Sequence, residues 1–136
     1  MRPGMPTQSH PTDIVFFEGL RVYGYHGVHP EERSLGQWFE IDVQIETSTR
    51  EAGEHDRLEA TVSYSDLMRR VNDVVTAEAK QLIEALAESI ATAVLAHDER
   101  IAATTVTVRK PDAPVKGIAF GAVGVTIRRE REGVRR

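Results

Sequence analysis

One lysine occupies a position at which its amine could serve as a base. Lys110 ends an alternating β-type segment, in the sequence VTVRKPDAP, and lies directly before Pro111. Of the 17 basic residues 14 are arginines, so a lysine at this point suggests a role that arginine cannot fill. Unlike a guanidinium, an amine can lose its proton when it is removed from water. The alternative is a surface lysine whose stem lies along the protein while its head stays in solvent.

Two further residues have types and positions that suit ligand binding. Glu84 falls in the first turn of an expected helix, offset from its apolar stripe, so its carboxylate either complements the helix dipole or faces a ligand. Tyr64 falls at the entry to another expected helix, where an aromatic side chain either packs as a hydrophobic staple or stacks on a ligand. The pattern alone favours the first alternative in both cases.

The histidines do not form a recognisable metal site. His26 and His29 are separated by two residues in a polar turn, and no third ligand follows at a recognisable spacing, so we expect a surface pair. Because the chain has no cysteine, thiolate zinc sites, iron–sulfur clusters, disulfides and cysteine nucleophiles are excluded. The sequence contains neither a P-loop nor a dinucleotide-binding glycine motif, so nucleotide-loop functions lack support.

The elements that must position these residues follow from hydrophobic periodicity. Segment 14–25 is rich in β-branched and aromatic residues, with glycines that indicate a bulge or bend, and segment 39–47 alternates. Apolar residues recur at helical spacing from 67 to 75 and from 82 to 94. Residues 104–108 and 123–127 alternate again. The order ββααββ predicts an α+β fold, an antiparallel four-stranded sheet with both helices on one face.

Length and composition bound the class of protein. The 136 residues suit one domain, which we place at 13–130, between a disordered N-terminal leader at 1–12 and a C-terminal tail at 131–136. No stretch approaches the roughly 18 apolar residues of a membrane span, and the N-terminus lacks the apolar region of a secretory signal. We therefore expect a cytoplasmic protein without membrane contact. The net charge of −4 argues against a general nucleic-acid binder.

The predicted sheet raises the question of its edges. An open four-stranded sheet leaves unpaired backbone groups on its two outer strands, and proteins usually charge, cover or pair such edges. Both ends of this chain are rich in β-type residues. We therefore favour assembly through the sheet edges over a monomer.

Four segments of the sequence carry a family resemblance. They read GYHGVHPEERSLGQWFEIDV, TVSYSDL, LIEALAESIA and VRKPDAPV, and with their spacing they cover about Asp13 to Arg129. Together they resemble the dihydroneopterin aldolases of folate biosynthesis. The resemblance implies the tunnelling fold, in which four subunits join sheet edges into a barrel with the helices outside. Two such rings then stack into a homo-octamer.

The same resemblance implies a reaction and its catalytic residues. The pterin substrate, 7,8-dihydroneopterin, is cleaved by a retro-aldol reaction to 6-hydroxymethyl-7,8-dihydropterin and glycolaldehyde, with accompanying C2′ epimerisation to 7,8-dihydromonapterin. No metal, cofactor or Schiff base is used. The general base falls on Lys110, the tyrosine that relays a proton through ordered water falls on Tyr64, and the glutamate that binds the side-chain hydroxyls falls on Glu32.

The resemblance also implies a pterin-binding set. Glu84 becomes the anchor, because a carboxylate offers two acceptors to the parallel N–H donors of the 2-amino-4-oxopyrimidine edge. Ile83, Thr61 and Val62 match positions that line the pterin slot. In the family the site lies between subunits. One chain is expected to give Glu84 and Lys110, and its neighbour the remaining contacts, from Glu32, Thr61, Val62 and Tyr64.

Two alternatives remain beside this interpretation. Dihydroneopterin-triphosphate epimerase shares the fold and differs in how the site treats a triphosphate tail. A catalytically silent pterin-binding barrel is the alternative from a different class. The presence of both Lys110 and Tyr64 argues against the silent barrel.

Overall fold

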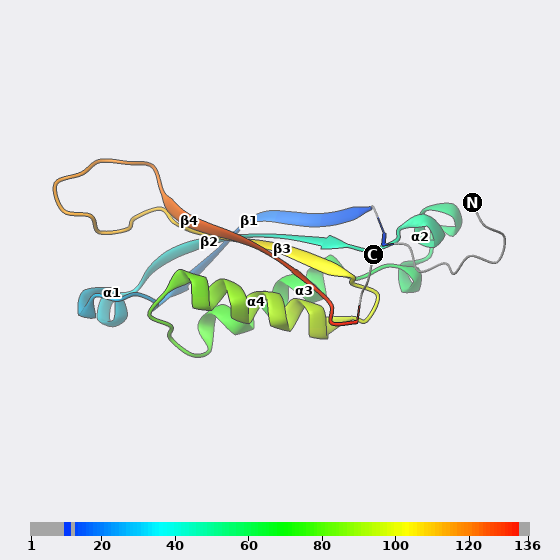
Figure 1. The fold of residues 1–136 in the computed structure, drawn as a ribbon, viewed down its shortest axis with the longest axis horizontal. Helices are drawn as coiled ribbons and strands as arrows, with labels where there is room; N and C mark the ends of the chain where they lie inside the picture. The colour runs from blue at the N-terminus through cyan, green and yellow to red at the C-terminus, as the bar shows by residue number, and fades with distance from the viewer. Residues whose placement is uncertain (1–9, 12, 134–136) are drawn as a thin grey trace.

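The computed structural model describes residues 10, 11 and 13–133. Most of the predicted leader and the last three residues of the predicted tail lie outside the described residues, so the leader's disorder stays a prediction. The elements run β1, α1, β2, α2, η1, α3, α4, β3 and β4 along the chain. The long strands and helices follow the predicted order ββααββ, with short helices added between them (Figure 1).

The sheet has the predicted antiparallel topology, with strand order β1-β2-β3-β4. Its strands are β1 (Ile14–Gly24), β2 (Gln37–Glu46), β3 (Ala103–Lys110) and β4 (Val123–Glu130). The predicted bulge in β1 is present: the register shifts between Phe17 and Leu20, and Gly19 adopts a positive φ of 74°. Within the chain β1 and β4 are the two sheet edges, as the sequence predicted.

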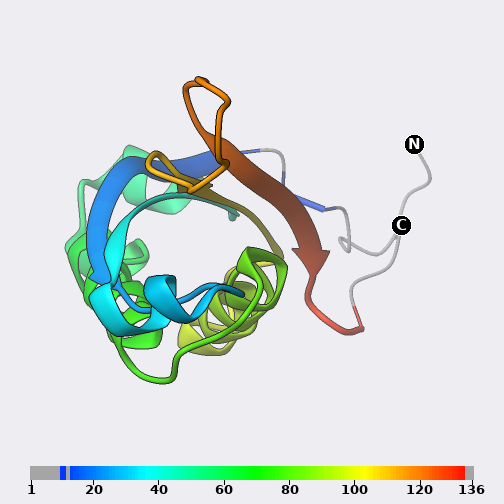
Figure 2. The same ribbon diagram turned by 90° about the vertical axis from the view of Figure 1, so that its left-hand side faces the viewer.

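Both long helices cover one face of the sheet. α3 (Tyr64–Thr76) and α4 (Ile83–His97) pack on each other, α3 contacts β1, and α4 contacts β3 and β4. Figure 2 shows the sheet curving over them. The alternating side chains Phe39, Ile41 and Val43 of β2 face the helices and are fully buried. Among the residues that the structure describes, no helix has the length and apolar character needed to cross a membrane.

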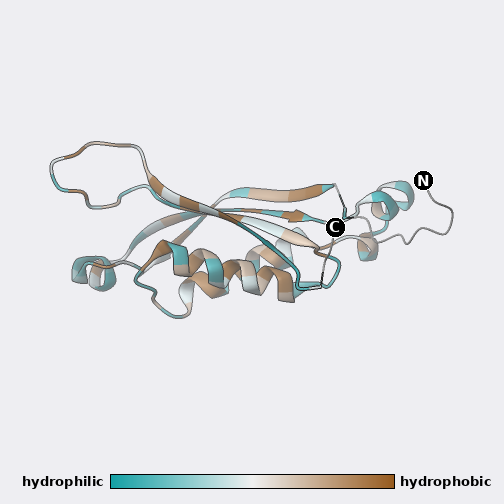
Figure 3. Cartoon of the chain, in the orientation of Figure 1, coloured by the Kyte–Doolittle hydropathy of each residue, from teal (hydrophilic) through white to brown (hydrophobic). Residues whose placement is uncertain are grey.

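Three short helical segments were not predicted. α1 (Pro30–Leu35) lies in the region expected to be a polar turn, and α2 (Arg50–His55) and the 3-10 turn η1 (Leu58–Ala60) lie in the expected charged connection. Figure 3 shows α1 and α2 as mostly hydrophilic. Such short segments bury too few apolar residues to show a helical period, although Pro30 at the first helical position is a helix-start signal.

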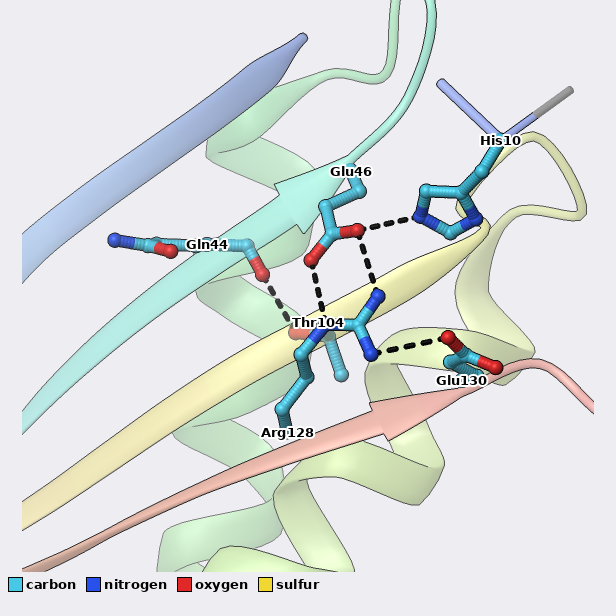
Figure 4. Close-up of polar contacts among 6 residues, drawn as sticks. All are labelled: His10, Gln44, Glu46, Thr104, Arg128 and Glu130. Atoms are coloured by element: carbon cyan, nitrogen blue, oxygen red, sulfur yellow. Dashed lines mark hydrogen bonds and ion pairs between the residues drawn. The ribbon is translucent and has the colours of Figure 1, made fainter. Parts of the chain in front are cut away.

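The sheet face opposite the helices carries a cluster of charged side chains at one end. At the end where β2 finishes, Glu46 accepts two hydrogen bonds of 2.9 Å from the guanidinium of Arg128 and one from His10 (Figure 4). Arg128 also donates to Glu130 at 3.0 Å. His10, within the predicted leader, thus contacts the sheet. The hydrogen bonds from Arg128 lower the pKa of Glu46 to about 2.

The lowered pKa of Glu46 predicts that the protein loses stability in acid. The folded pKa of about 2 lies below the ordinary value of 4.5, so the unfolded chain binds more protons between these values, and the free energy of unfolding falls as pH falls from 4.5 to 2. Because the side chain of Arg128 is 44% exposed, we expect this contribution to be about 1 kcal/mol. Urea unfolding at several pH values should show a shallower acid slope for Glu46→Gln. Glu54→Gln, in an exposed pair with Arg50, should keep the original slope.

Candidate active site

An ion pair between two predicted catalytic residues lies at one end of the sheet. The Nζ atom of Lys110, the last residue of β3, is 2.7 Å from Oε2 of Glu32 on α1. Their side chains are 14% and 4% exposed, so the pair is largely removed from solvent. The fold therefore brings together a basic and an acidic group from positions 78 residues apart.

The Glu32 carboxylate is held by two further donors. The backbone N–H of His29 donates to Oε1 at 3.1 Å, and the side-chain amide of Gln37 donates to Oε2 at 3.1 Å. Burial by itself would raise the pKa of Glu32, but the hydrogen bonds from Lys110, His29 and Gln37 outweigh it and lower that pKa below its ordinary value. Glu32 is thus an ionised acceptor with a fixed orientation.

The predicted placement of Glu32 on the neighbouring subunit is wrong. Glu32 and Lys110 contact each other within one chain. The reason is the sheet register: β3 runs antiparallel to β2, with Arg109 opposite Glu40, so β3 ends near the start of β2, which α1 directly precedes. Both residues therefore lie at the same end of one chain.

Gln37 is a member of this cluster that the sequence interpretation missed. A carboxylate only accepts hydrogen bonds, so the amide nitrogen of Gln37 must face Glu32. Its Oε1 is buried and has no hydrogen-bond partner among the described residues. A cavity of about 350 Å³ adjoins the cluster, lined by Glu32 and Gln37 together with Tyr23, Trp38 and Asp112. This amide oxygen is an unpaired acceptor, and the Gln37 side chain must shift before a ligand hydroxyl can reach it.

The predicted pterin anchor lies at the same end of the molecule. α4 begins at Ile83, which packs into the core, and the side chain of Glu84 in the first turn is exposed. Figure 1 shows the start of α4 at the end of the sheet where α1 lies. Glu84 does not line the cavity beside Glu32.

The other predicted contacts lie at the opposite end. Tyr64 begins α3 just after α2 and η1, and its side chain is 61% exposed. α3 ends beside the end of β1, since the carbonyl of Val75 binds His26 at 2.7 Å, and its 13 residues span about 20 Å. The structure therefore does not bring Tyr64 to the Glu32–Lys110 pair of the same chain.

Thr61 and Val62 lie with Tyr64, before the start of α3. Val62 is buried in the core at 3% exposure, while Thr61 is half-buried. Arg100 holds this segment by donating to the backbone carbonyls of Glu59 and Thr61, each at 3.2 Å. Of the seven predicted site residues, four lie at the α1 end and three at the α2 end, so within one chain they form two separate groups.

The expectation that His26 belongs to a surface pair is wrong. His26 is 1% exposed, and its ring contacts that of Phe39 edge-on with centroids 5.2 Å apart. The polar turn begins after this residue, because the end of α3 and the α3–α4 connection cover it.

Comparisons with known proteins agree with the fold. A family model described as dihydroneopterin aldolase (FolB) matches residues 15–128. A dihydroneopterin aldolase of Bacillus subtilis is 41% identical over 119 residues, which cover 88% of this chain and 98% of that protein.

Two solved structures of the same enzyme are also similar. The Escherichia coli dihydroneopterin aldolase in complex with neopterin has a TM-score of 0.79 and 30% identity, covering 87% of this chain and 99% of that one. A Burkholderia thailendensis dihydroneopterin aldolase bound to guanine has a TM-score of 0.72 and 26% identity, covering 88% and 92%.

Proposed function

The chain belongs to the dihydroneopterin aldolase family, and we propose that its α1-end cluster carries out the retro-aldol cleavage of 7,8-dihydroneopterin. The products are 6-hydroxymethyl-7,8-dihydropterin and glycolaldehyde. The observation that carries this proposal is the secluded ion pair of Lys110 and Glu32, because it places an amine and a hydroxyl-binding carboxylate in one small space. The enzyme is a lyase.

Glu84 is the proposed anchor of the pterin ring. Neopterin and guanine, the ligands of the two similar structures, share a 2-amino-4-oxopyrimidine edge with two parallel N–H donors. The exposed carboxylate of Glu84, on the first turn of α4, supplies two acceptors for such an edge. Ile83 gives this turn a fixed place by packing into the core. Thr61 and Val62 are proposed to line the ring slot from the adjacent subunit.

Lys110 is the proposed general base. Once the ammonium of the ion pair has given up a proton to solvent, the neutral amine takes the proton of the 2′-hydroxyl, a carbonyl forms at C2′, and the C1′–C2′ bond breaks to release glycolaldehyde. The electron pair of that bond moves into the dihydropterin, which accepts it as an enamine and makes a Schiff base unnecessary. A proton delivered to C1′ then completes 6-hydroxymethyl-7,8-dihydropterin. We assign its relay, through ordered water, to Tyr64 of the adjacent subunit.

Glu32 and Gln37 are proposed to hold the hydroxylated side chain. Glu32 accepts from a hydroxyl, and Oε1 of Gln37 offers a second acceptor beside it once the side chain shifts to expose this buried atom. Before glycolaldehyde leaves, the enamine can attack its carbonyl and re-form the C1′–C2′ bond. If glycolaldehyde first rotates, so that the enamine attacks the other face of its carbonyl, C2′ takes the opposite configuration. This is the proposed epimerisation to 7,8-dihydromonapterin.

Assembly into a ring is part of the proposal. The edge strands β1 and β4 can pair between chains and close a barrel, with α3 and α4 outside. Such pairing would bring the Tyr64 half-site of one chain to the Glu32–Lys110 half-site of the next. We propose a tetrameric ring and, by stacking of two rings, an octamer.

The direct test is to incubate the purified protein with 7,8-dihydroneopterin in the presence of a metal chelator. We expect 6-hydroxymethyl-7,8-dihydropterin and glycolaldehyde to form, as followed by chromatography. Conversion of dihydroneopterin triphosphate but not of dihydroneopterin would favour the epimerase instead. Pterin binding without turnover of either compound would favour the silent barrel.

Glu84→Gln should weaken binding of every 2-amino-4-oxopteridine, including pterin without a side chain. The amide loses the charge and one acceptor, and a hydrogen bond to a charged group contributes about 1.5 to 3 kcal/mol. Calorimetric titration with pterin measures the change. Glu88→Gln, one turn further along α4 and paired with exposed Arg129, is the matched control and should bind pterin normally. Unchanged pterin affinity in Glu84→Gln would indicate that Glu84 complements the helix dipole and does not bind the ring.

A further inference from the structure

His26 is a buried polar side chain with both ring nitrogens bonded to backbone. Its Nε2–H donates to the carbonyl of Val75 at 2.7 Å, and its Nδ1 accepts from the N–H of Lys80 at 2.9 Å. A carbonyl only accepts and an N–H only donates, so these partners fix a neutral ring with its proton on Nε2. Burial lowers the pKa of His26, which favours the same state.

The next residue binds the other side of the same peptide segment. The N–H of Gly27 donates to the carbonyl of Lys80 at 2.9 Å. Residues 26 and 27 therefore bind both backbone groups of Lys80. Lys80 lies in the connection between α3 and α4, three residues before Ile83, where α4 begins, and four before Glu84. The place of the first turn of α4 thus depends on this double contact.

Gly27 also packs against the catalytic carboxylate. A Cβ atom built on Gly27 would lie 2.4 Å from both Cβ and Oε1 of Glu32, so only glycine fits here. The carbonyl of Gly27 accepts from Arg33 of α1 at 3.0 Å. The dipeptide His26–Gly27 therefore contacts α1 on one side and the α3–α4 connection on the other.

We propose that His26 is a positioning residue, which fixes Glu84 at the start of α4 relative to the Glu32–Lys110 pair. It does so by accepting from the N–H of Lys80, while its donation to the carbonyl of Val75 orients the ring, so that the α3–α4 connection keeps one place relative to β1. The inference rests on the proposed function, since it concerns the distance between the ring anchor and the base. A histidine that only stabilised the core would leave affinity for the ligand unchanged once the protein is folded.

Two polar substitutions separate these roles. In His26→Asn the side-chain oxygen can take the place of Nδ1 and accept from Lys80, whereas in His26→Gln the longer amide can replace Nε2 and donate to Val75. The probe is neopterin, which is titrated by fluorescence at a temperature where each variant is folded. Val71→Ala, which truncates a fully buried residue of α3, is the control for loss of stability alone.

We expect His26→Gln to lose about tenfold in neopterin affinity, the scale of one hydrogen bond, and His26→Asn to bind within a few-fold of the original protein. The amide of Lys80 should exchange with solvent faster in His26→Gln than in His26→Asn. Val71→Ala should bind normally despite a lower melting temperature.

The proposal is overturned if both His26 variants bind neopterin like the original protein. It is also overturned if each His26 variant loses affinity in proportion to its loss of melting temperature, and Val71→Ala loses affinity in the same proportion. Failure of the original protein to bind neopterin or cleave 7,8-dihydroneopterin would instead count against the proposed function, so the two failures are distinguishable.

Discussion

Lys110→Ala should remove nearly all aldol cleavage while pterin binding survives. In the proposed mechanism the amine acts on the 2′-hydroxyl of the side chain, whereas ring binding depends on Glu84 at the start of α4. General base catalysis contributes roughly 100-fold to 10,000-fold, so we expect the turnover rate to fall within that range. Turnover is measured by chromatography of the products under saturating 7,8-dihydroneopterin, and binding by titration with neopterin.

The control for this substitution must separate catalysis from folding. Removing Lys110 leaves the Glu32 carboxylate buried, although the hydrogen bonds from His29 and Gln37 remain to hold it. Circular dichroism and size-exclusion chromatography should therefore show a folded, assembled variant with a lowered melting temperature. Lys116→Ala changes an exposed lysine of the β3–β4 connection and should keep full turnover. Undiminished turnover in Lys110→Ala would contradict the assignment of Lys110 as the general base.

The sequence predicts the large elements because their patterns report burial directly. β2 alternates between buried apolar residues such as Phe39 and Ile41 and outward polar residues such as Asp42, which is what a sheet with one covered face requires. The long helices bury a stripe of side chains, so their spacing is equally plain. The short helices α1 and α2 bury almost nothing, and only their caps could have indicated them.

The sequence predicts the residues of the candidate site better than it predicts how they are arranged. Residue types and the family resemblance select Lys110, Glu32 and Glu84, but which chain contributes each residue depends on sheet register, and register is set by long-range pairing. The roles of His26 and Gln37 depend on partners 54 and 5 residues away. In the sequence alone, His26 looks like any polar turn residue, because its burial comes from the end of α3 and the connection that follows.

The proposed division of the site between chains predicts complementation. Lys110→Ala damages the α1-end half-site and Tyr64→Ala the α2-end half-site, and each variant alone should have little activity. When the two proteins are mixed, dissociated and reassembled, about a quarter of the interfaces should combine the intact half of each, since subunits distribute at random in a symmetric ring. Activity should return toward that fraction of the original. Light scattering must first show that each variant assembles.

A second pair of variants tests the placement of Glu32. Because Glu32 contacts Lys110 within one chain, Glu32→Ala and Lys110→Ala damage the same half-site, and every mixed interface lacks one group or the other. This pair should therefore stay inactive after reassembly, whereas Glu32→Ala mixed with Tyr64→Ala should regain activity. If Glu32 acted from the neighbouring subunit, the two results would be exchanged. Full activity of an isolated monomer, or no recovery in any well-mixed assembly, would show that the site is not shared between chains.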